Sequence, residues 1–258
     1  MKKKVKNKRG FTLVELSIVL VIVGLLIGGI LVGQSLVESA KINVFVRQIQ
    51  QYDIAVNGFK TKYKCFPGDC VAISQGNGNG LIQTAAGNAA GFVQEIAKFW
   101  ESLSSMNMIP EKYTSVLAYT SPSSYRRGGH GPKVALGYNT TIYVAGVANP
   151  WSTFPNSNLY HIIQPGRTWY DTNGYTSLGI MDVIAIEGKM DDGHPATGNI
   201  KASAGGYPGL IGFVPSYAWP AFDSGTTCVV NLPAPTAYNK STTELCSITI
   251  KMLSQVGQ

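Results

Sequence analysis

The sequence has few charged residues. Only 14% of its 258 residues are Asp, Glu, Lys or Arg, whereas 45% are hydrophobic. Such a chain is too apolar and too aromatic to be intrinsically disordered. Its 4 cysteines are too few for a fold that depends on disulfides alone. The length allows one sizeable hydrophobic core or two small ones.

Basic residues are scarce after residue 10. Six of the 21 Lys and Arg residues lie within the first ten positions, which leaves 15 basic against 14 acidic side chains in the rest of the chain. A net charge of +7 would otherwise favour nucleic acid as a partner, but a nearly neutral chain offers phosphate little attraction. A local patch around Arg126, Arg127 and Lys133 is the remaining candidate. The terminal cluster instead indicates membrane topology.

Between Phe11 and Val32 the chain lacks every ionisable side chain except Glu15. A helix of this length spans about 33 Å, which is enough to cross a bilayer. Because basic residues precede it, the positive-inside rule predicts a cytoplasmic N-terminus and an extracytoplasmic chain after about residue 37. The competing interpretation is a secretory signal peptide. Its apolar region would be shorter, and residues 33–35 are a weak cleavage site.

Glu15 places a carboxylate within the predicted membrane span, where an unpaired charge in the hydrocarbon region costs roughly 2.5 to 3.5 kcal/mol. No Lys or Arg lies between Phe11 and Ala40. One interpretation is that Glu15 lies near the membrane edge and reaches the interface. The other is a cationic partner from another chain or from a newly made N-terminus. Cleavage after Gly10 would supply the α-amino group of Phe11 in the next copy.

The segment RGFTLVE at residues 9–15, after a short basic leader, resembles the processing site of type IV pilins and of the pseudopilins of type II secretion. The resemblance implies that prepilin peptidase removes residues 1–10 between Gly10 and Phe11 and that the Phe11 amine is methylated. It also implies a homo- or hetero-oligomeric filament with other pilins, an inner-membrane assembly platform as a partner, and a role for Glu15 in docking incoming subunits.

No proline occurs between Phe11 and Cys65, and apolar residues recur at spacings of three and four beyond the span. This pattern predicts one helix over residues 11–63, transmembrane over about 11–32 and amphipathic afterwards. Many pilins carry a proline in the membrane half. Here four glycines could loosen the helix or allow close helix packing, or they could be ordinary membrane-helix glycines: Gly24, Gly28, Gly29 and Gly33.

Residues 64–258 are predicted to form an extracytoplasmic globular head. Residues 75–91 and 115–132 have the composition of loops, and a second helix is predicted between them, from Phe92 to Met106. The β-rich runs cover residues 140–147, 159–163, 183–187, 200–203, 210–214, 228–232 and 247–252. Runs separated by Gly and Pro turns predict an antiparallel sheet. The fold class is therefore α+β, with the long helix packed on the sheet.

Cys65 and Cys70 flank Pro67-Gly68, a pair typical of a type II turn. In an oxidising compartment these two cysteines are expected to form a disulfide, as are Cys228 and Cys246, although four cysteines allow three connectivities. The loop between Cys228 and Cys246 resembles the C-terminal disulfide region of many pilins. The compartment and the spacing disfavour metal ligation by these thiols.

Enzyme motifs are missing: there is no GxSxG, no HExxH, no Walker loop and no GxGxxG opening a helix. We therefore expect no enzymatic activity and no organic cofactor. His130, His161 and His194 are far apart in the sequence and are predicted to be surface or structural residues.

Two segments have residues that suit calcium, which prefers oxygen ligands. Asp191 and Asp192 precede a Gly/Pro turn, and some pseudopilins have a calcium-stabilised loop; the alternative is ordinary turn chemistry. Residues 76–80 alternate Gly and Asn, but no carboxylate follows until Glu95. A flexible loop without metal is predicted there.

The function expected from these features is that of a structural subunit of a type IV pilus or pilus-like filament, with a minor pilin in adhesion, motility or DNA uptake favoured by the head size. A pseudopilin of type II secretion is the alternative. A signal-anchored periplasmic enzyme or binding protein is the alternative from another class. Most aromatic residues are expected in the core or in subunit contacts, and four are candidates for an adhesive surface: Trp151, Tyr160, Trp169 and Tyr170.

Overall fold

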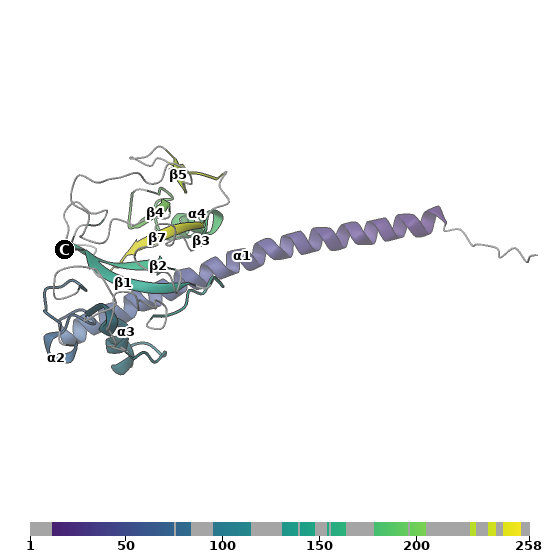
Figure 1. The fold of residues 1–258 in the computed structure, drawn as a ribbon. Helices are drawn as coiled ribbons and strands as arrows, with labels where there is room; N and C mark the ends of the chain where they lie inside the picture. Colours follow the sequence, from purple (N-terminus) through teal and green to yellow (C-terminus); the bar gives the residue numbers. More distant parts are fainter. Residues whose placement is uncertain are drawn as a thin grey trace, which may run out of the picture. The chain divides into compact units, whose positions relative to one another are not determined.

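The computed structural model describes residues 12–74, 76–83, 95–114, 131–138, 140–147, 154, 156–163, 178–195, 197–204, 228–230, 237–240 and 245–253. Helices and strands follow one another as α1 (Leu13–Tyr63), α2 (Val71–Ser74), α3 (Glu95–Ser105), β1 (Thr141–Val147), β2 (Ser157–Ile163), β3 (Leu178–Gly179), α4 (Ile180–Met190), β4 (Ile200–Ala204), β5 (Val229–Val230), β6 (Ala237–Tyr238) and β7 (Leu245–Lys251) (Figure 1). The chain divides into two compact units, Met1–Lys41 and Ile42–Gln258.

The first unit contains the N-terminal part of α1. Its large apolar side chains are exposed from Leu13 to Val37. By length and composition this part of the helix could cross a membrane. A signal sequence passes the same test, so the match to the predicted span at residues 11–32 does not separate the two interpretations.

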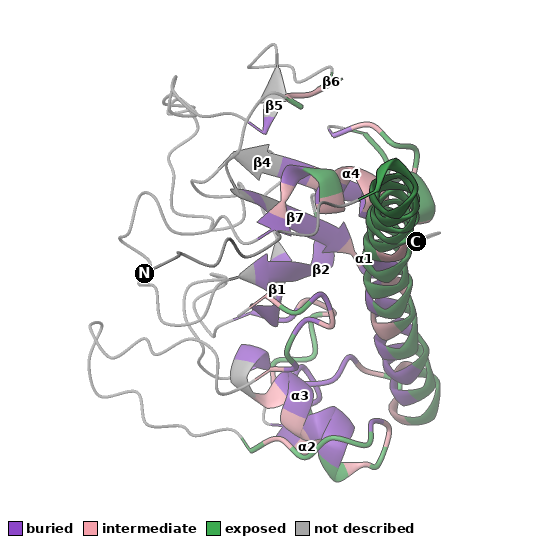
Figure 2. Cartoon of the chain, turned by 90° about the vertical axis from the view of Figure 1, so that its right-hand side faces the viewer, coloured by how far each residue is buried: buried purple, intermediate pink, exposed green. Residues whose placement is uncertain are grey.

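The second unit contains the rest of α1, which buries one stripe and exposes the other side (Figure 2). The stripe has the predicted spacing of three and four residues and consists of Ile42, Phe45, Ile49, Tyr52, Val56 and Phe59. Gln48 of α1 donates from Nε2 to the Lys133 carbonyl at 2.7 Å and accepts from the Ala135 amide at 3.0 Å. The Tyr160 hydroxyl of β2 donates to Asp53 of α1 at 3.2 Å. The buried stripe of α1 from Ile42 onward is therefore part of the head core.

The sheet is antiparallel, and β7 lies at its centre. β2 pairs with β1 and with residues 248–251 of β7, whereas β4 pairs with residues 246–250 of β7. Ile250 lies between Tyr160 of β2 and Ile200 of β4, and all three are buried. β3 pairs with residues 245–246 of β7, and β5 with β6 forms a separate two-stranded sheet. These contacts confirm the α+β class with a long N-terminal helix and an antiparallel sheet.

The strand predicted at residues 183–187 is wrong, because this segment lies within helix α4. The short apolar run Val-Ile-Ala-Ile is compatible with a strand or with a helix, and the residues on either side of it decide which one forms. Ile180, Val183, Ile186 and Glu187 are buried at helical spacing and face the core, so a helix buries this apolar set on one side.

The other predicted elements have varied outcomes. The predicted second helix is confirmed as α3, although Phe92 lies outside the described residues. β1, β2, β4, β5 and β7 correspond to predicted strands, whereas α2, β3 and β6 were not predicted. The strand predicted at residues 210–214 lies outside the described residues.

Candidate functional site

The start of α1 is the first candidate site. Gly10 and Phe11 lie outside the described residues, and the description begins at Thr12. The Thr12 amide donates to Glu15 Oε2 at 2.8 Å, and the Thr12 hydroxyl donates to the same oxygen at 2.9 Å. In return the Glu15 amide donates to Thr12 Oγ1 at 3.2 Å. This reciprocal arrangement is a capping box, which supplies acceptors to two amides that a helix start leaves unpaired.

The capping box gives Glu15 partners within its own chain. Its carboxylate accepts hydrogen bonds from the Thr12 amide, and that amide follows directly on Phe11, the residue expected to become the mature N-terminus. A carboxylate at a helix N-terminus is also favoured by the helix dipole. Whether Glu15 also reaches the interface or pairs with a second chain stays a prediction.

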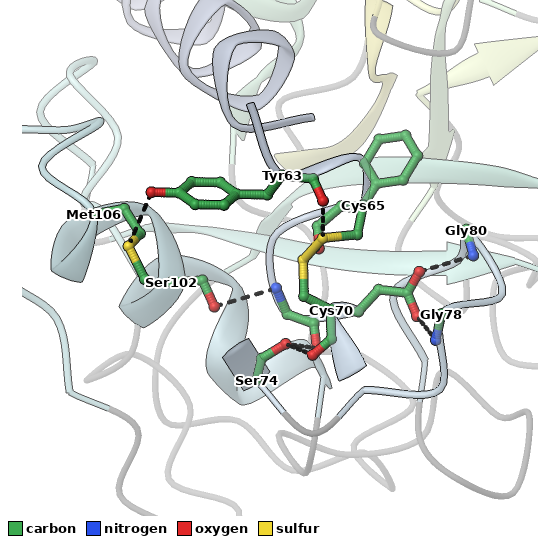
Figure 3. The surroundings of a disulfide bond; sticks show 11 residues. Tyr63, Cys65, Cys70, Ser74, Gly78, Gly80, Ser102 and Met106 are labelled. Atoms are coloured by element: carbon green, nitrogen blue, oxygen red, sulfur yellow. Dashed lines mark hydrogen bonds between the residues drawn. A yellow bond between two sulfur atoms is a disulfide. The ribbon is translucent and has the colours of Figure 1, made fainter. Parts of the chain in front are cut away.

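The end of α1 leads into a disulfide-closed turn (Figure 3). Figure 3 shows this disulfide, which joins Cys65 to Cys70. A second disulfide joins Cys228 to Cys246, and these are the two pairs that the sequence analysis gives. Gly68 within the turn has φ +84°, and a Cβ there would lie 2.2 Å from the Glu95 carbonyl oxygen. Only glycine therefore fits this turn against the start of α3.

Two buried carboxylates lie beneath the glycine-rich loop, a feature that the sequence analysis missed. Asp69 accepts from the Gly78 amide at 2.7 Å and from the Gly80 amide at 2.8 Å. Glu95, at the start of α3, accepts from the amides of Asn77 and Gln83, both at 2.7 Å. Asp69 is 1% exposed and Glu95 is 3% exposed. Loop 76–83 is thus held by backbone amides that converge on two acids, one on each side of it in the sequence.

The electrostatics of this pair follow from its burial. Burial raises the pKa of the Asp69 carboxyl, and the loop amides lower it in part. Burial also raises the pKa of the Glu95 carboxyl, to which the charge of Asp69 adds. The amides of residues 77, 78, 80 and 83 point their N–H groups at these carboxylates. Converging N–H groups form an anion-binding nest, whereas a calcium loop presents oxygen atoms to the ion.

A third acidic group lies at the end of α4. Glu187, Asp191 and Asp192 each place one carboxylate oxygen within 4.8 Å of the others. Burial raises the pKa of Glu187 to about 8, the hydroxyl of Tyr238 lowers it, and the charges of Asp191 and Asp192 raise it further. The sequence analysis named the two aspartates. Glu187 was missed because its segment was predicted to be a strand.

His161 and Tyr160 are buried in the head. His161 is buried, its Nδ1 lies 3.1 Å from Thr249 Oγ1, and burial lowers its pKa to about 3, so the ring is neutral. The backbone amide of His194 donates to Asp192 at 2.9 Å. Tyr160 was a candidate for an adhesive surface, which is wrong, because its side chain is fully buried. His130, Trp151, Trp169 and Tyr170 lie outside the described residues, as do Arg126 and Arg127.

Comparison with known families identifies one region of the chain. Residues 5–31 match the model of the prokaryotic N-terminal methylation motif. Comparisons with curated proteins and with solved structures found no match. The matched residues include Gly10, Phe11 and Glu15. The chain therefore carries the prepilin signature of type IV pilins and pseudopilins, at the start of a long helix that leads into a pilin-like α+β fold.

Proposed function

We propose that the mature chain is a non-enzymatic subunit of a type IV pilus or pilus-like filament. One observation carries the proposal: the prepilin signature at residues 5–31 opens a helix of 51 residues whose second half is built into the core of an antiparallel-sheet head. The first half of that helix would supply the filament core, and the head would face outward.

The exposed apolar surface of α1 supports assembly. Its large side chains between Leu13 and Val37 contact no core of their own unit, so lipid or other helices must cover them. Gly24, Gly28, Gly29 and Gly33 have open space where a Cβ would lie, and this allows close approach of a neighbouring helix. Glu15 already caps its own helix, and in a filament we expect its carboxylate to pair with the Phe11 amine of the next subunit.

The proposed route begins in the inner membrane with the N-terminus in the cytoplasm, as the basic leader indicates. Prepilin peptidase would cut between Gly10 and Phe11 and methylate Phe11, and an inner-membrane platform would then add the subunit to a filament with other pilins. The size of the head and its two disulfides favour a minor pilin with a role in adhesion, motility or DNA uptake.

A pseudopilin of the type II secretion system is the second candidate, because the signature is common to both groups. Shearing separates the two: a pilus subunit is expected in sheared surface filaments, and a pseudopilin is expected to stay with the cell. The candidate from another class is a signal-anchored periplasmic protein, which would keep its leader and would not depend on Glu15.

The test begins with mass spectrometry of the N-terminal peptide from native membranes. The proposal expects a chain that starts at N-methylated Phe11 and expects the Gly10→Ala variant to keep its leader. An intact Met1, or a cut beyond Gly33, in cells with an active prepilin peptidase contradicts the proposal.

Assembly is tested separately with Glu15→Gln. Cleavage should be unchanged, and incorporation into filaments should fall strongly, because the carboxylate is expected to pair with the incoming amine. Glu38→Gln is the matched control, since it removes an exposed carboxylate from the same helix beyond the expected span. Equal incorporation of both variants would rule out the proposed role of Glu15.

A further inference from the structure

Two neighbouring amides of loop 76–83 bind different acids. The Asn77 amide donates to Glu95 Oε1 and the Gly78 amide donates to Asp69 Oδ1, both at 2.7 Å. The Cα atoms of consecutive residues are only about 3.8 Å apart, so these two bonds hold the carboxyls side by side. The carboxyls are also hydrogen-bonded to each other. Such a bond needs a proton on one of them, because an ionised carboxylate only accepts.

The surroundings of this pair favour one negative charge over two. The loop donates four amide hydrogen bonds to the pair, which stabilise a single charge well. Asp69 and Glu95 are both buried, so a second charge would meet the first at close range and with little screening by water. The pair therefore gains from keeping one proton.

Positive charge near the pair comes from two helices. Lys60 and Lys64, at the end of α1, line a cavity together with Asp69, and Lys98 follows Glu95 by three residues in α3. The loop itself has no charged side chain. These ammonium groups favour ionised carboxyls and so oppose the retention of the proton.

The titration of the two acids reflects the balance between these effects. Burial raises the pKa of both carboxyls, and the loop amides lower both in part. The bond between the carboxyls lowers the pKa of Asp69 and raises the pKa of Glu95, so Glu95 is the acid that keeps the proton.

The far end of the loop has an anchor that does not titrate. The Asn158 side chain of β2 donates to the Gly80 carbonyl at 2.9 Å and accepts from the Ile82 amide at 2.8 Å. The Asn77 and Gly80 amides instead donate to Glu95 and to Asp69. A change in the protonation of the acids should therefore act on Asn77 and Gly80 more than on Ile82.

We propose that Asp69 and Glu95 hold one proton between them and that this proton keeps loop 76–83 closed, so that the loop loosens as the pH rises. When the loop opens, water reaches both carboxyls, and their pKa values return toward the ordinary 3.8 and 4.5. Above pH 4.5 the open state thus binds fewer protons than the closed state. Closure is favoured at low pH and is lost as the pH rises through the raised pKa of Glu95, with release of the proton to solvent.

The loop is one wall of a cavity of about 380 Å³, which Lys60, Lys64 and Phe66 also line. Loosening of the loop would open this wall, so the proton would control access to a cavity that carries two lysines. This inference goes beyond the filament role, because it concerns the head alone.

The experiment uses the full chain in detergent micelles and follows amide hydrogen exchange by NMR between about pH 5 and 8. Each rate is divided by the intrinsic exchange rate at that pH, which gives the protection of the amide. The protection of the Asn77 and Gly80 amides should fall, by at most about tenfold per pH unit, because one proton is released. The Ile82 amide should keep more of its protection. A ¹³C titration of the carboxyls should show Glu95 titrating above its ordinary 4.5.

Variants connect the pH dependence to the pair. Glu95→Gln cannot release a proton, so its loop should be less protected than that of the parent at low pH but should change little as the pH rises. Asp69→Asn removes the charge that raises the pKa of Glu95, so Glu95 should titrate at a lower pH than in the parent. Glu111→Gln removes an exposed carboxyl elsewhere in the head and should keep the pH dependence of the parent.

Any of three results overturns the proposal: titration of Glu95 at or below pH 4.5, protection of Asn77 and Gly80 that does not fall with pH in the parent, or an equal fall in Glu95→Gln and the parent. None of them depends on filament assembly, since the leader and Glu15 are unchanged in every variant. Failure of the proton-linked loop would leave the proposed filament role intact, and the reverse holds as well.

Discussion

Asp53 carries a prediction that joins burial, pH and stability. It lies on the core-facing side of α1, is 4% exposed, and accepts a hydrogen bond from Tyr160 at the centre of the sheet. Burial raises the pKa of its carboxyl from 3.8 to about 6, while the Tyr160 hydroxyl and the Leu253 amide lower it in part. The folded chain therefore retains a proton that the unfolded chain has already lost at pH 5.

The sign of the effect follows from this difference. Below pH 3.8 Asp53 is protonated in both states, and its contribution to stability is fully present. As the pH rises toward about 6, the unfolded state binds fewer protons than the folded state, so the free energy of unfolding falls. A shift of about two pKa units corresponds to about 3 kcal/mol.

The perturbation is Asp53→Asn, which keeps the shape and an acceptor for Tyr160 but cannot ionise. We expect the free energy of unfolding of the parent, relative to the variant, to fall by about 3 kcal/mol between about pH 3.5 and 7. Urea unfolding of the full chain in mild detergent, followed by tryptophan fluorescence, measures this; Trp100 is buried and packs edge-on against Tyr52.

Two further variants serve as controls. Glu111→Gln removes one exposed charge from the same unit and should follow the parent curve. Tyr160→Phe removes the hydrogen bond that lowers the pKa of Asp53, so its pH window should extend upward. If the parent and Asp53→Asn have parallel stability curves over this range, the proposed titration of Asp53 is refuted.

Three further predictions concern single contacts. Gly68→Ala should lower the free energy of unfolding by about 1 to 3 kcal/mol, measured by urea titration. Its methyl group would clash with the Glu95 carbonyl oxygen, and its backbone would have to keep a positive φ. Glu95→Gln should cost about 1 to 3 kcal/mol in the same assay, because its NH₂ group would face an amide of Asn77 or Gln83; an unchanged midpoint would contradict this. Thr12→Ala should speed hydrogen exchange of the Glu15 amide in micelles, since it removes the cap at a cost of about 0.5 to 2 kcal/mol.

The sequence predicts the elements that have a long, regular pattern. The apolar spacing from Ile42 to Phe59 gave the amphipathic half of α1, and the Cys65-to-Cys70 segment gave a closed turn, because both depend on residues close in the chain. The α+β fold class could be predicted for the same reason, because the N-terminal part of the chain has helical periodicity and the β-rich runs lie in the C-terminal part.

Short apolar runs were harder. Residues 183–187 alone fit a strand, whereas the longer window from Ile180 to Glu187 has helical spacing. A window of five residues cannot distinguish the two periods. Missing this helix also concealed Glu187 as a neighbour of Asp191, although residues four apart on a helix lie on one face.

Contacts that have no repeating sequence pattern could not be predicted from one sequence. Loop 76–83 has the composition of a flexible connection, yet its amides converge on Asp69 and Glu95. Neither acid has a local pattern that indicates burial, because the reason for burial is the loop itself. Only the fold shows that the glycines serve to bring backbone donors close to carboxylates.

The central place of β7 has a consequence for biogenesis. Residues 245–251 pair with β2 on one edge and β4 on the other, so the strands translated earlier have no common partner until β7 is present. Such non-local pairing is slow, so in a nascent chain β1 and β2 can pair with each other, but the sheet stays incomplete until β7 has left the ribosome. Chaperones and proteases would therefore meet a chain with an incomplete sheet first, and a frameshift anywhere upstream of residue 245 would leave a product for proteolysis.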